Sequence, residues 1–599
     1  MKIDISKAFD CLSWEFLLDI LKARGFGSKW CSWICGLLSS ASSSVLINGE
    51  TSPPFAVGKG VRQGDSLSLA LFILAIDALQ GMIEWAGSNN LLASLGLDIR
   101  IPRASIFADD AVLFFTPATS DLQVIEAMLK LFGEASGLKV NFAKSTITCI
   151  RCEENRAVEI AAFFGCQHSS FPLKYLGLPL SIYRLKRQDI LPMIDKFSSK
   201  MKGWKPKLLA PASRLALTSS VLMALPIHFL SVFPLPVWAL KMIDRRCRSF
   251  LWKGEEDING GHCLVPWARV CRPKEWGGLG LLNLKNFGTA LRCRWLWLGW
   301  SQGNRPWQLL PDQQDKDAAA MFDAACRVVL GNGETTRFWS DNWAPGGRII
   351  AVLAPALFSF VKDSNLSVKD ALHNRRWIKD IKGGLTTQAL SQYLLVWDIA
   401  HATTLSAATE DQLLWKLTEN HQFTVNSAYR MFFTAGVSFA CNKPIWKTKA
   451  PARCKFFMWL VIQRKFLTAD NILRCGWPFN DHCPLCLMFP EDCSHLFLLC
   501  RFTQQLWTAF QQWSGVSFPM PNSSSGSTEA WWLEARRAIP KHLRRNFDTM
   551  VILIHWRVWR ERNARIFQQM ACDVDRVLDL IREDIGVWRS AGCVSDLVS

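Results

Sequence analysis

Two periodicities of apolar residues run through the first 180 residues, and together they predict a mixture of helices and strands. Residues 14–21 carry apolar side chains at positions i, i+3, i+4 and i+7, which predicts an amphipathic helix. Ser13 before this segment is a typical N-cap residue, and Gly25 after it is typical of a helix end. The chain is therefore expected to begin with a short segment that leads into a well-defined helix.

Segments whose pattern predicts strands lie between the predicted helices. Residues 42–48 and 54–60 are expected to form two strands around a turn that contains Pro53–Pro54. Residues 104–115 predict a strand, a tight turn and a second strand, with a pair of aspartates at the turn. The combination of helices and antiparallel strands predicts the α+β class.

Longer apolar segments predict further helices at residues 67–87 and 122–132, the second ended by Gly137. From about residue 183 to 440 the pattern is mostly helical and rich in Trp. Residues 215–240 contain no Lys, Arg, Asp or Glu and are long enough to span a bilayer. Because three prolines interrupt this segment, we interpret it as buried helices; a membrane span is the alternative.

The composition of the chain is strongly basic. The chain has 69 Lys and Arg against 51 Asp and Glu, a net charge of +18, which favours a polyanionic partner such as nucleic acid or an anionic membrane surface. A generally basic, solvated surface is the alternative. Charged residues stand where a signal peptide needs an apolar run, so the chain is not expected to be secreted. Its 20 cysteines show no regular framework and are interpreted as reduced thiols with one metal site.

Three carboxylates form the first candidate site. Asp109 and Asp110 are adjacent anions in apolar surroundings, which is costly unless a cation offsets their repulsion. Asp4 lies in a strand-like segment, and a strand beside the 104–115 hairpin would bring all three carboxylates together. Such a group could hold two Mg²⁺ ions that activate a hydroxyl and stabilise a leaving pyrophosphate. The alternative is that the aspartate pair only forms a polar hairpin turn.

A glycine-bracketed loop, GVRQGD at residues 60–65, precedes the 67–87 helix. Arg62 offers a planar cation and Gln63 a neutral donor and acceptor, while the glycines permit close approach to phosphates or bases. A simple capped helix start is the alternative interpretation.

In order along the chain, DISKAFD, GVRQGD, FADD, SGLKVNFAKS and KYLGLPLS resemble the palm of a reverse transcriptase of the non-LTR, LINE-type retrotransposons of plants. The resemblance implies that Asp4, Asp109 and Asp110 bind Mg²⁺ or Mn²⁺, and that Phe9 is the steric gate against a ribose 2′-hydroxyl. It also implies nucleotide, template and primer contacts from further residues: Arg62, Gln63, Gly64, Lys144, Lys174, Tyr175, Leu176 and Gly177.

The sequence departs from this family pattern in several places. Phe107 replaces the usual Tyr, and Ser66 and Leu69 replace two prolines. Asp4 is four residues from the start, so the fingers and endonuclease that usually precede it are expected to be missing, and the chain alone is expected to polymerise poorly or not at all. A viral RNA-copying polymerase fits less well, because such enzymes usually have Gly where Ala108 stands.

A second candidate site is the segment CPLCLMFPEDCSHLFLLC. Cys483, Cys486, His495 and Cys500 have the residue types and spacing of a structural, tetrahedral zinc site, although Cys493 complicates the ligand assignment. The alternative is that His495 and Cys500 pack in a helical core. The segment resembles the zinc-binding domain that follows plant LINE-type reverse transcriptases, and the later WRVWRERNARIF resembles the region beyond it.

The basic and aromatic residues before the zinc segment allow two interpretations. Their cations could neutralise phosphates while the rings stack on bases. Alternatively, the aromatic residues form a core face and the cations point outward. The residues in question are Phe456, Phe457, Trp459 and Leu460.

Together these observations predict four segments: a palm (1–182), a helical thumb and Trp-rich connector (183–440), a zinc-binding domain (441–515), and a linker with a basic helical region (516–599). The expected function is RNA-directed DNA synthesis on an RNA template from a DNA primer and deoxynucleoside triphosphates, in the nucleus or cytoplasm and without a membrane. The alternative is an inactive relic that only binds nucleic acid.

Overall fold

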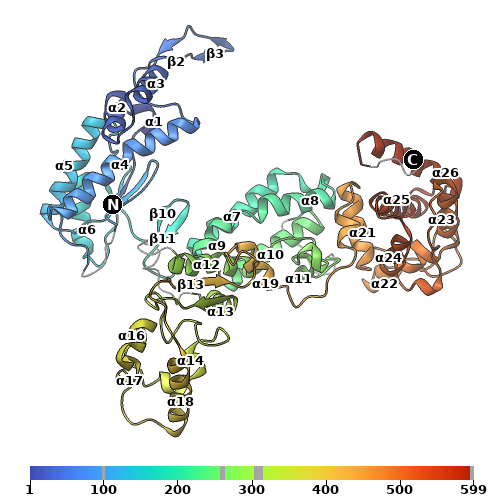
Figure 1. Ribbon diagram of the computed structural model, residues 1–599. Helices are drawn as coiled ribbons and strands as arrows, with labels where there is room; N and C mark the ends of the chain where they lie inside the picture. The colour runs from blue at the N-terminus through green and yellow to red at the C-terminus, as the bar shows by residue number, and fades with distance from the viewer. Residues whose placement is uncertain (97–101, 256–262, 302–314, 594–599) are drawn as a thin grey trace. The chain divides into compact units, whose positions relative to one another are not determined.

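The computed structural model describes residues 1–96, 102–255, 263–301 and 315–593 of the chain. It divides into two compact units, Met1–Asp189 and Ile190–Ser599 (Figure 1). The division lies close to residue 182, where the sequence predicted the end of the first segment. Helices and strands are both present in the first unit, as expected for the α+β class.

A five-stranded sheet with the order β6-β7-β1-β8-β9 forms the centre of the first unit. Its pairs are antiparallel except for β8 with β9, which is parallel. The strands are β1 (Lys2–Ile3), β6 (Ala104–Phe107), β7 (Asp110–Leu113), β8 (Thr146–Ile147) and β9 (Gln167–His168). The predicted strand–turn–strand at residues 104–115 is therefore confirmed.

Helices bury the inner face of this sheet. Ile3 and Ala111 of the strands share one core with Phe72 of α4 and Ile125 of α5. The predicted helix caps are observed: Ser13 accepts a hydrogen bond from Phe16 N. The helices of the unit are α1 (Ala8–Cys11), α2 (Trp14–Ala23), α3 (Ser28–Ser39), α4 (Ser66–Ser88), α5 (Thr119–Ser136), α6 (Glu154–Phe164) and the start of α7 (Arg187–Gly203).

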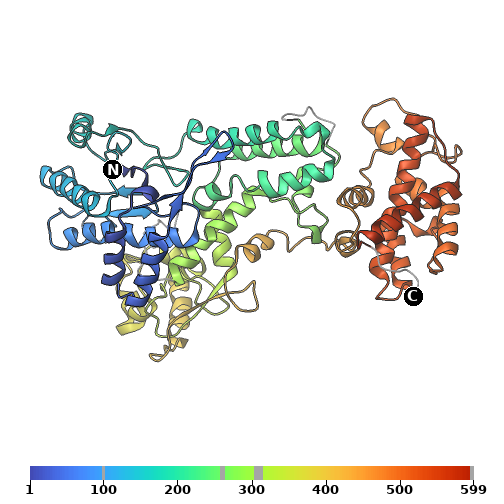
Figure 2. The same cartoon turned by 90° about the horizontal axis from the view of Figure 1, so that it is seen from above.

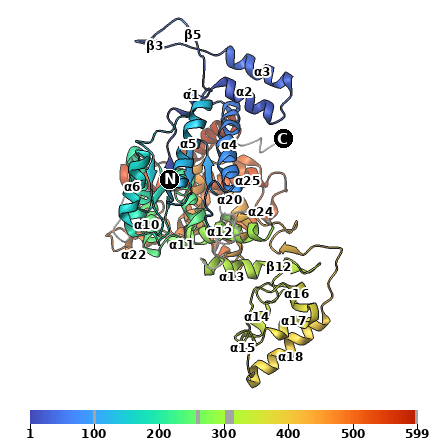
Figure 3. The ribbon, with the colours of Figure 1, turned by 90° about the vertical axis from the view of Figure 1, so that its left-hand side faces the viewer.

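Residues 42–56 form an arm of two short antiparallel pairs, β2 (Ser42–Ser43) with β5 (Phe55–Ala56) and β3 (Leu46–Ile47) with β4 (Glu50–Thr51). Figures 1 and 3 show the arm extending away from α4 and α5. The prediction of a turn at Pro53–Pro54 was wrong, because the chain reverses at Asn48–Gly49. Both of those residues have positive φ (51° and 92°), as a two-residue hairpin turn requires.

The second unit is mainly helical. Residues 215–240 form short helices separated at prolines, as predicted, and Leu222, Phe229 and Leu230 are buried in the unit. Figure 2 shows the C-terminal helices, in red, gathered into one bundle. The helices up to residue 301 are η1 (Pro206–Leu208), α8 (Pro211–Leu217), η2 (Thr218–Leu222), α9 (Ile227–Val232), α10 (Val237–Trp252), α11 (Trp267–Val270), η3 (Lys274–Trp276) and α12 (Leu284–Ser301).

A strand pair, β12 (Cys326–Val329) with β13 (Gln412–Trp415), crosses the middle of this unit. The helices between residues 316 and 462 are α13 (Lys316–Ala325), α14 (Ile350–Leu353), α15 (Pro355–Phe358), α16 (Val368–Leu372), η5 (His373–Arg375), α17 (Arg376–Lys379), α18 (Thr387–Ala402), α19 (Val425–Met431), α20 (Asn442–Trp446) and α21 (Ala452–Ile462). The remaining ones are α22 (Ala469–Arg474), η6 (His495–Leu499), α23 (Arg501–Ser514), η7 (Ser523–Ser525), α24 (Thr528–Ala538), α25 (Arg544–Asn563), η8 (Ala564–Gln568) and α26 (Val574–Ser590).

In the described part of the chain, α4 is the one helix long and apolar enough to cross a membrane by length and composition alone. Core helices of soluble proteins pass the same test. The side chains of Phe72, Ala75, Ile76 and Leu79 on α4 are buried in the core of the first unit.

Asp411 organises a loop at the edge of the β12–β13 pair. Its carboxylate accepts hydrogen bonds from the backbone N–H groups of Gly331, Gly333, Thr335 and Thr336 and from both threonine hydroxyls. Burial alone would raise the pKa of Asp411, but these hydrogen bonds outweigh it and lower the pKa below its ordinary value. The carboxylate therefore stabilises the fold in its charged form.

Replacing Asp411 by Asn is expected to destabilise this loop by about 2–3 kcal/mol, because hydrogen bonds to a charged acceptor are lost and buried donors remain. The amides of residues 331–336 should then exchange faster in hydrogen-exchange measurements. Because the pKa of Asp411 is lowered in the folded state, its stabilisation is present above the ordinary carboxyl pKa and is lost as the pH falls. Glu410→Gln, at the exposed neighbouring residue, is the control; equal exchange in both variants would contradict the assignment.

Candidate functional site

The strand register brings the segment of Asp4 toward Asp110. β1 pairs antiparallel with β7 so that Lys2 faces Val112 and Ile3 faces Ala111. β1 ends at Ile3, and continuing the same register by one residue would set Asp4 opposite Asp110. Ile3 and Ala111 are buried in the core. Because side chains alternate across a strand, Asp4 and Asp110 lie on the opposite, outer face of the sheet.

Asp109 lies at the tip of the hairpin that carries Asp110. Phe107 pairs with Asp110, which leaves Ala108 and Asp109 as a two-residue turn. Ala108 has φ 52°, a left-handed conformation that costs a non-glycine residue about 1–2 kcal/mol. A positive φ at this position is the geometry of a two-residue hairpin turn. Asp109 is exposed at this tip, and Asp110 is half-buried.

Among the described residues, the one group with three or more potential ligand atoms within 4.8 Å of one another is the Cys/His group discussed below. Asp109 and Asp110 share the β6–β7 hairpin and Asp4 follows the neighbouring strand β1, but the oxygens of the three are not gathered as closely as the Cys/His ligand atoms. The donor set itself fits a hard divalent cation, which prefers carboxylate oxygens and retains several water ligands. Exposure of Asp109 leaves room for those waters.

The GVRQGD loop packs against the segment that follows Asp4. Gly60 N donates to Leu12 O, Val61 N donates to Phe9 O, and the Trp14 indole N–H donates to Gly60 O. Gly60 has φ 82°, and a Cβ there would lie 2.6 Å from the carbonyl oxygen of Asp10, so only glycine fits. The contacts hold the loop next to the first aspartate segment.

The predicted binding residues of the loop point outward. Arg62, Gln63 and Gly64 are exposed, and the Asp65 carboxylate accepts a hydrogen bond from Leu67 N and caps α4. The structure is therefore compatible with both interpretations of this segment. Asp65 caps the helix, and the polar side chains before it are exposed.

Phe9 is fixed by an aromatic partner. Its ring stacks on Phe72 of α4, with ring centroids 4.6 Å apart and an interplanar angle of 21°. Phe9 is half-buried, so one part of its ring packs in the core and the rest remains accessible. The ring position is thus set by the helix that follows the GVRQGD loop.

The block expected to contact the primer forms a hairpin, β10 (Leu173–Tyr175) with β11 (Leu178–Leu180). Its turn is Leu176–Gly177, with φ values of 48° and 79°. The Tyr175 hydroxyl lies 3.0 Å from both the hydroxyl and the carbonyl oxygen of Ser105 on β6. Lys174 and Gly177 are exposed.

Lys144 and Lys2 differ in their surroundings. Lys144 is exposed in the turn before β8. Lys2, which the sequence analysis did not identify, places its ammonium 3.3 Å from a carboxylate oxygen of Asp110. Its position two residues before Asp4 on an alternating strand is the signal that could have indicated it, because residues i and i+2 share a face.

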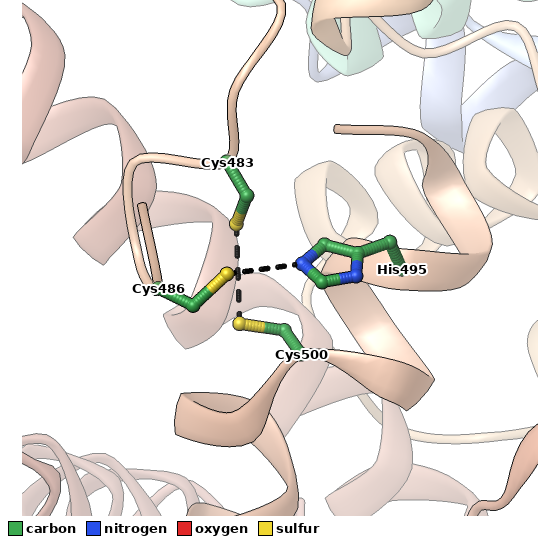
Figure 4. Close-up of side chains that lie close together, drawn as sticks. All are labelled: Cys483, Cys486, His495 and Cys500. Atoms are coloured by element: carbon green, nitrogen blue, oxygen red, sulfur yellow. Dashed lines mark hydrogen bonds between the residues drawn. The ribbon is translucent and has the colours of Figure 1, made fainter. Parts of the chain in front are cut away.

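Cys483, Cys486, His495 and Cys500 converge on one point (Figure 4). The Sγ atoms of Cys483 and Cys500 are 3.9 Å apart, and Cys486 Sγ lies 3.3 Å from His495 Nε2. A tetrahedral zinc ion with Zn–S distances of about 2.3 Å places two sulfurs about 3.8 Å apart. The spacing therefore fits zinc, and four protein ligands leave no open coordination position for catalysis.

Cys493 does not belong to this group. It is buried, and its Sγ lies 4.0 Å from the Thr468 hydroxyl. Burial raises the pKa of the Cys493 thiol to about 12, so it remains protonated and a poor metal ligand at neutral pH.

Arg565 of the C-terminal region contacts the Cys/His loop directly. Its guanidinium donates to the carbonyl oxygens of Pro484 and Leu485, which lie between Cys483 and Cys486, and it pairs with the Glu561 carboxylate. Arg565 thus holds the backbone of the loop that carries two ligands. From the sequence alone, this arginine was expected only to be part of a basic helical region.

A buried ion pair joins the same loop to α25. Glu491 and Arg562 have side chains 0% and 1% exposed, and two N–H groups of Arg562 donate to the two carboxylate oxygens. Glu491 also accepts from Ala469 N, and the guanidinium lies over the rings of Trp559 and Phe479. Removing one partner of such a pair would leave an uncompensated buried charge.

The aromatic residues before the zinc segment form a core. Phe456, Phe457, Trp459 and Leu460 are buried on α21, so their rings are not exposed for stacking on bases. The expected linker after residue 515 is also partly anchored, because Phe518 is buried against Trp507 and Phe547.

The folded chain is expected to bind one zinc ion at the Cys/His group. Cys486→Ser removes a ligand and should lose the metal, whereas Cys493→Ser, on the same segment, should retain it. Mass spectrometry of the metal content of the purified proteins measures both. Zinc-free folded wild type, or equal retention in the two variants, would contradict the ligand assignment.

Arg565→Met is expected to weaken zinc binding by about 10–100-fold, the usual effect of losing an outer-shell partner of a metal ligand. Competition with a chromogenic chelator measures the affinity. Arg560→Met is the matched control, because Arg560 is exposed on the same stretch of helix. An unchanged affinity in Arg565→Met would show that the loop keeps its shape without this contact.

Two parts of the chain match known protein families. Residues 1–180 match the family described as reverse transcriptase (RNA-dependent DNA polymerase), and residues 423–507 match the one described as zinc-binding in reverse transcriptase. The first match contains the three aspartates, and the second contains the four zinc ligands.

Several proteins share 27–28% identity with the chain. A putative ribonuclease H protein of Arabidopsis thaliana is 27% identical over 55% of this chain and 57% of its own length. The transposon TX1 uncharacterized 149 kDa protein of Xenopus laevis is 27% identical over 44% of this chain and 20% of its own length. The retrovirus-related Pol polyprotein from the type-2 retrotransposable element R2DM of Drosophila melanogaster is 28% identical over 49% and 27%.

The chain thus spans between a fifth and about three fifths of the length of these relatives. Residues 1–180 are thus similar to reverse transcriptases and residues 423–507 to the zinc-binding part of such proteins, and the relatives include proteins of retrotransposable elements.

Proposed function

We propose that the chain transfers deoxynucleotides to a primer 3′-hydroxyl on an RNA template, with divalent ions held by Asp4, Asp109 and Asp110. The observation that carries this proposal is the pairing of Lys2 and Ile3 with Val112 and Ala111, because the next residues in this register are Asp4 and Asp110. The reverse transcriptase match over residues 1–180 supports the same assignment.

The residues of the first unit fit distinct tasks in this reaction. Two Mg²⁺ or Mn²⁺ ions, when bound, would activate the attacking hydroxyl and stabilise the leaving pyrophosphate. Asp4 and Asp110 would supply carboxylate oxygens from neighbouring strands, and Asp109 would supply one from the hairpin tip. Their placement on a sheet rather than on a long loop restricts their movement and so preorganises the site.

The remaining predicted residues would position the substrates. The ring of Phe9, fixed by its stack on Phe72, would exclude a ribose 2′-hydroxyl by its size. Arg62 and Lys144 are exposed cations suited to phosphates of the template and the nucleotide. The hairpin of β10 and β11 would hold the primer end, and the Tyr175–Ser105 contact ties it to the strand beside the aspartates.

The zinc-binding domain has a structural task in this proposal. Its four ligands leave no open position for chemistry, and its loop is held by Arg565 and Glu491. Binding of nucleic acid without synthesis is the alternative function. The ammonium of Lys2 on Asp110 favours that alternative, since a cation other than a metal already contacts a proposed ligand.

Primer extension on an RNA template with Mg²⁺ or Mn²⁺ tests the proposal. The wild-type chain is expected to synthesise DNA only slowly, and Asp109→Ala is expected to lower this rate by at least about 100-fold. Removing a ligand of ions that stabilise the transition state costs several kcal/mol, and each ~1.4 kcal/mol is a factor of ten.

Asp19→Ala is the control for this experiment, because Asp19 is an exposed carboxylate on α2 that pairs with Lys22. It should leave the rate within about twofold, as expected for an exposed surface pair. Salt-dependent RNA binding with no synthesis would overturn the proposal and favour the alternative. Synthesis that persists in Asp109→Ala would exclude the aspartate group as the catalytic centre.

A further inference from the structure

Lys2 lies on the outer face of the sheet, between the aspartates and the β10–β11 hairpin. Burial alternates along the first five residues, so Ile3 packs in the core while Lys2 and Asp4 share the other face. The Lys2 Nζ atom is 3.3 Å from Asp110 Oδ1, and its side chain is 29% exposed. This partial burial makes the pair less screened than an ordinary surface ion pair.

The same ammonium also contacts the hairpin. Lys2 Nζ donates a hydrogen bond of 3.0 Å to the carbonyl oxygen of Lys174. Tyr175 and Leu178 flank the two-residue turn and form the hydrogen-bonded pair, so Lys174 and Pro179 form a non-hydrogen-bonded pair. The carbonyl of Lys174 therefore points away from β11, where only an outside donor can satisfy it.

The hairpin has a second attachment on β6. The Tyr175 hydroxyl interacts with the Ser105 hydroxyl and carbonyl oxygen. The Lys2 and Tyr175 contacts both join the hairpin to the strands next to the aspartate turn. Only the Lys2 contact also involves a residue that the proposed function assigns to metal binding.

We propose that Lys2 is a positioning residue that couples metal binding at Asp110 to the docking of the β10–β11 hairpin. In the metal-free protein its ammonium holds both Asp110 and the Lys174 carbonyl. A divalent cation on Asp110 displaces the ammonium from the carboxylate and weakens its hold on the hairpin. This inference rests on the proposed function, because it requires a divalent cation at Asp110.

The coupling follows from competition for one carboxylate. A divalent cation on Asp110 would stand within a few ångströms of the Lys2 ammonium, and like charges at that distance repel. Coupling between two equilibria is reciprocal. The docked hairpin must therefore lower the affinity for the metal by the same factor by which the bound metal lowers the equilibrium constant for docking. Removing the charge of Lys2 should therefore loosen the hairpin and tighten metal binding at the same time.

Hydrogen exchange of the full chain tests the docking. Without divalent ions, Lys2→Met should speed amide exchange in residues 173–180 by on the order of tenfold, the effect of losing one charge-assisted hydrogen bond. Lys2→Arg should retain most of the protection, since it keeps a charged donor. Lys130→Met, an exposed lysine on α5, is the matched control and should leave the exchange unchanged.

Binding of Mn²⁺ tests the coupling. Titration of Mn²⁺ into wild type should speed exchange in residues 173–180, and the same titration should have no effect in Asp110→Asn. Lys2→Met should bind Mn²⁺ several-fold more tightly than wild type, because it removes a competing cation. If Lys2 only supported the fold, Lys2→Met would also speed exchange but would weaken Mn²⁺ binding. The direction of the change in Mn²⁺ affinity therefore distinguishes the two roles.

The outcomes distinguish the role of Lys2 from the proposed function of the chain. Unchanged exchange in Lys2→Met, or exchange in wild type that does not respond to Mn²⁺ bound at Asp110, would overturn the role of Lys2 and leave the proposed function standing. Failure to detect any Asp110-dependent Mn²⁺ binding would overturn both the proposed function and the coupling. Tighter Mn²⁺ binding with faster hairpin exchange in Lys2→Met would support the coupling.

Discussion

The antiparallel register between β1 and β7 is the constraint on which the candidate catalytic face depends. Burial of Ile3 against Ala111 fixes which residues face the core, because a shift by one residue would exchange the two faces of the strand. Continued by one residue, the observed register assigns Asp4 and Asp110 to the outer face. The hairpin turn then sets Asp109 beside them, and the packing of Gly60 against the Asp10 backbone brings the GVRQGD loop to the same region.

The net charge of +18 of the whole chain suggests a basic surface that could bind a polyanion. In the second unit, however, several arginines pair with carboxylates of the protein itself. Three arginines of the stretch WRVWRERNARIF pair with carboxylates: Arg557 with Asp584, Arg562 with Glu491, and Arg565 with Glu561. Two of these arginines hold the loop of the zinc ligands from outside the matched residues 423–507. The zinc-binding loop and the C-terminal helices therefore form one packed structure, and these cations are not available as a phosphate-binding surface.

Several differences between expectation and structure have specific physical causes. The arm turns at Asn48–Gly49 because positive φ values suit these residues, whereas the Pro53–Pro54 pair only separates two short strands. The aromatic residues of α21 are buried because the helix is apolar on all sides, with residues 456–461 all buried. Periodicity alone does not distinguish a stacking surface from a core face.

The sequence by itself determined the main helices of the first unit, the aspartate hairpin and the four residues of the Cys/His group, because these depend on local periodicity, turn chemistry and short spacings. Only the tertiary structure decided which residues surround them. Lys2 meets Asp110 across 108 positions of chain, and Arg565 meets the Pro484 carbonyl across 81. Such contacts are set by strand register and helix packing, which join residues far apart in the chain and leave no local pattern in it.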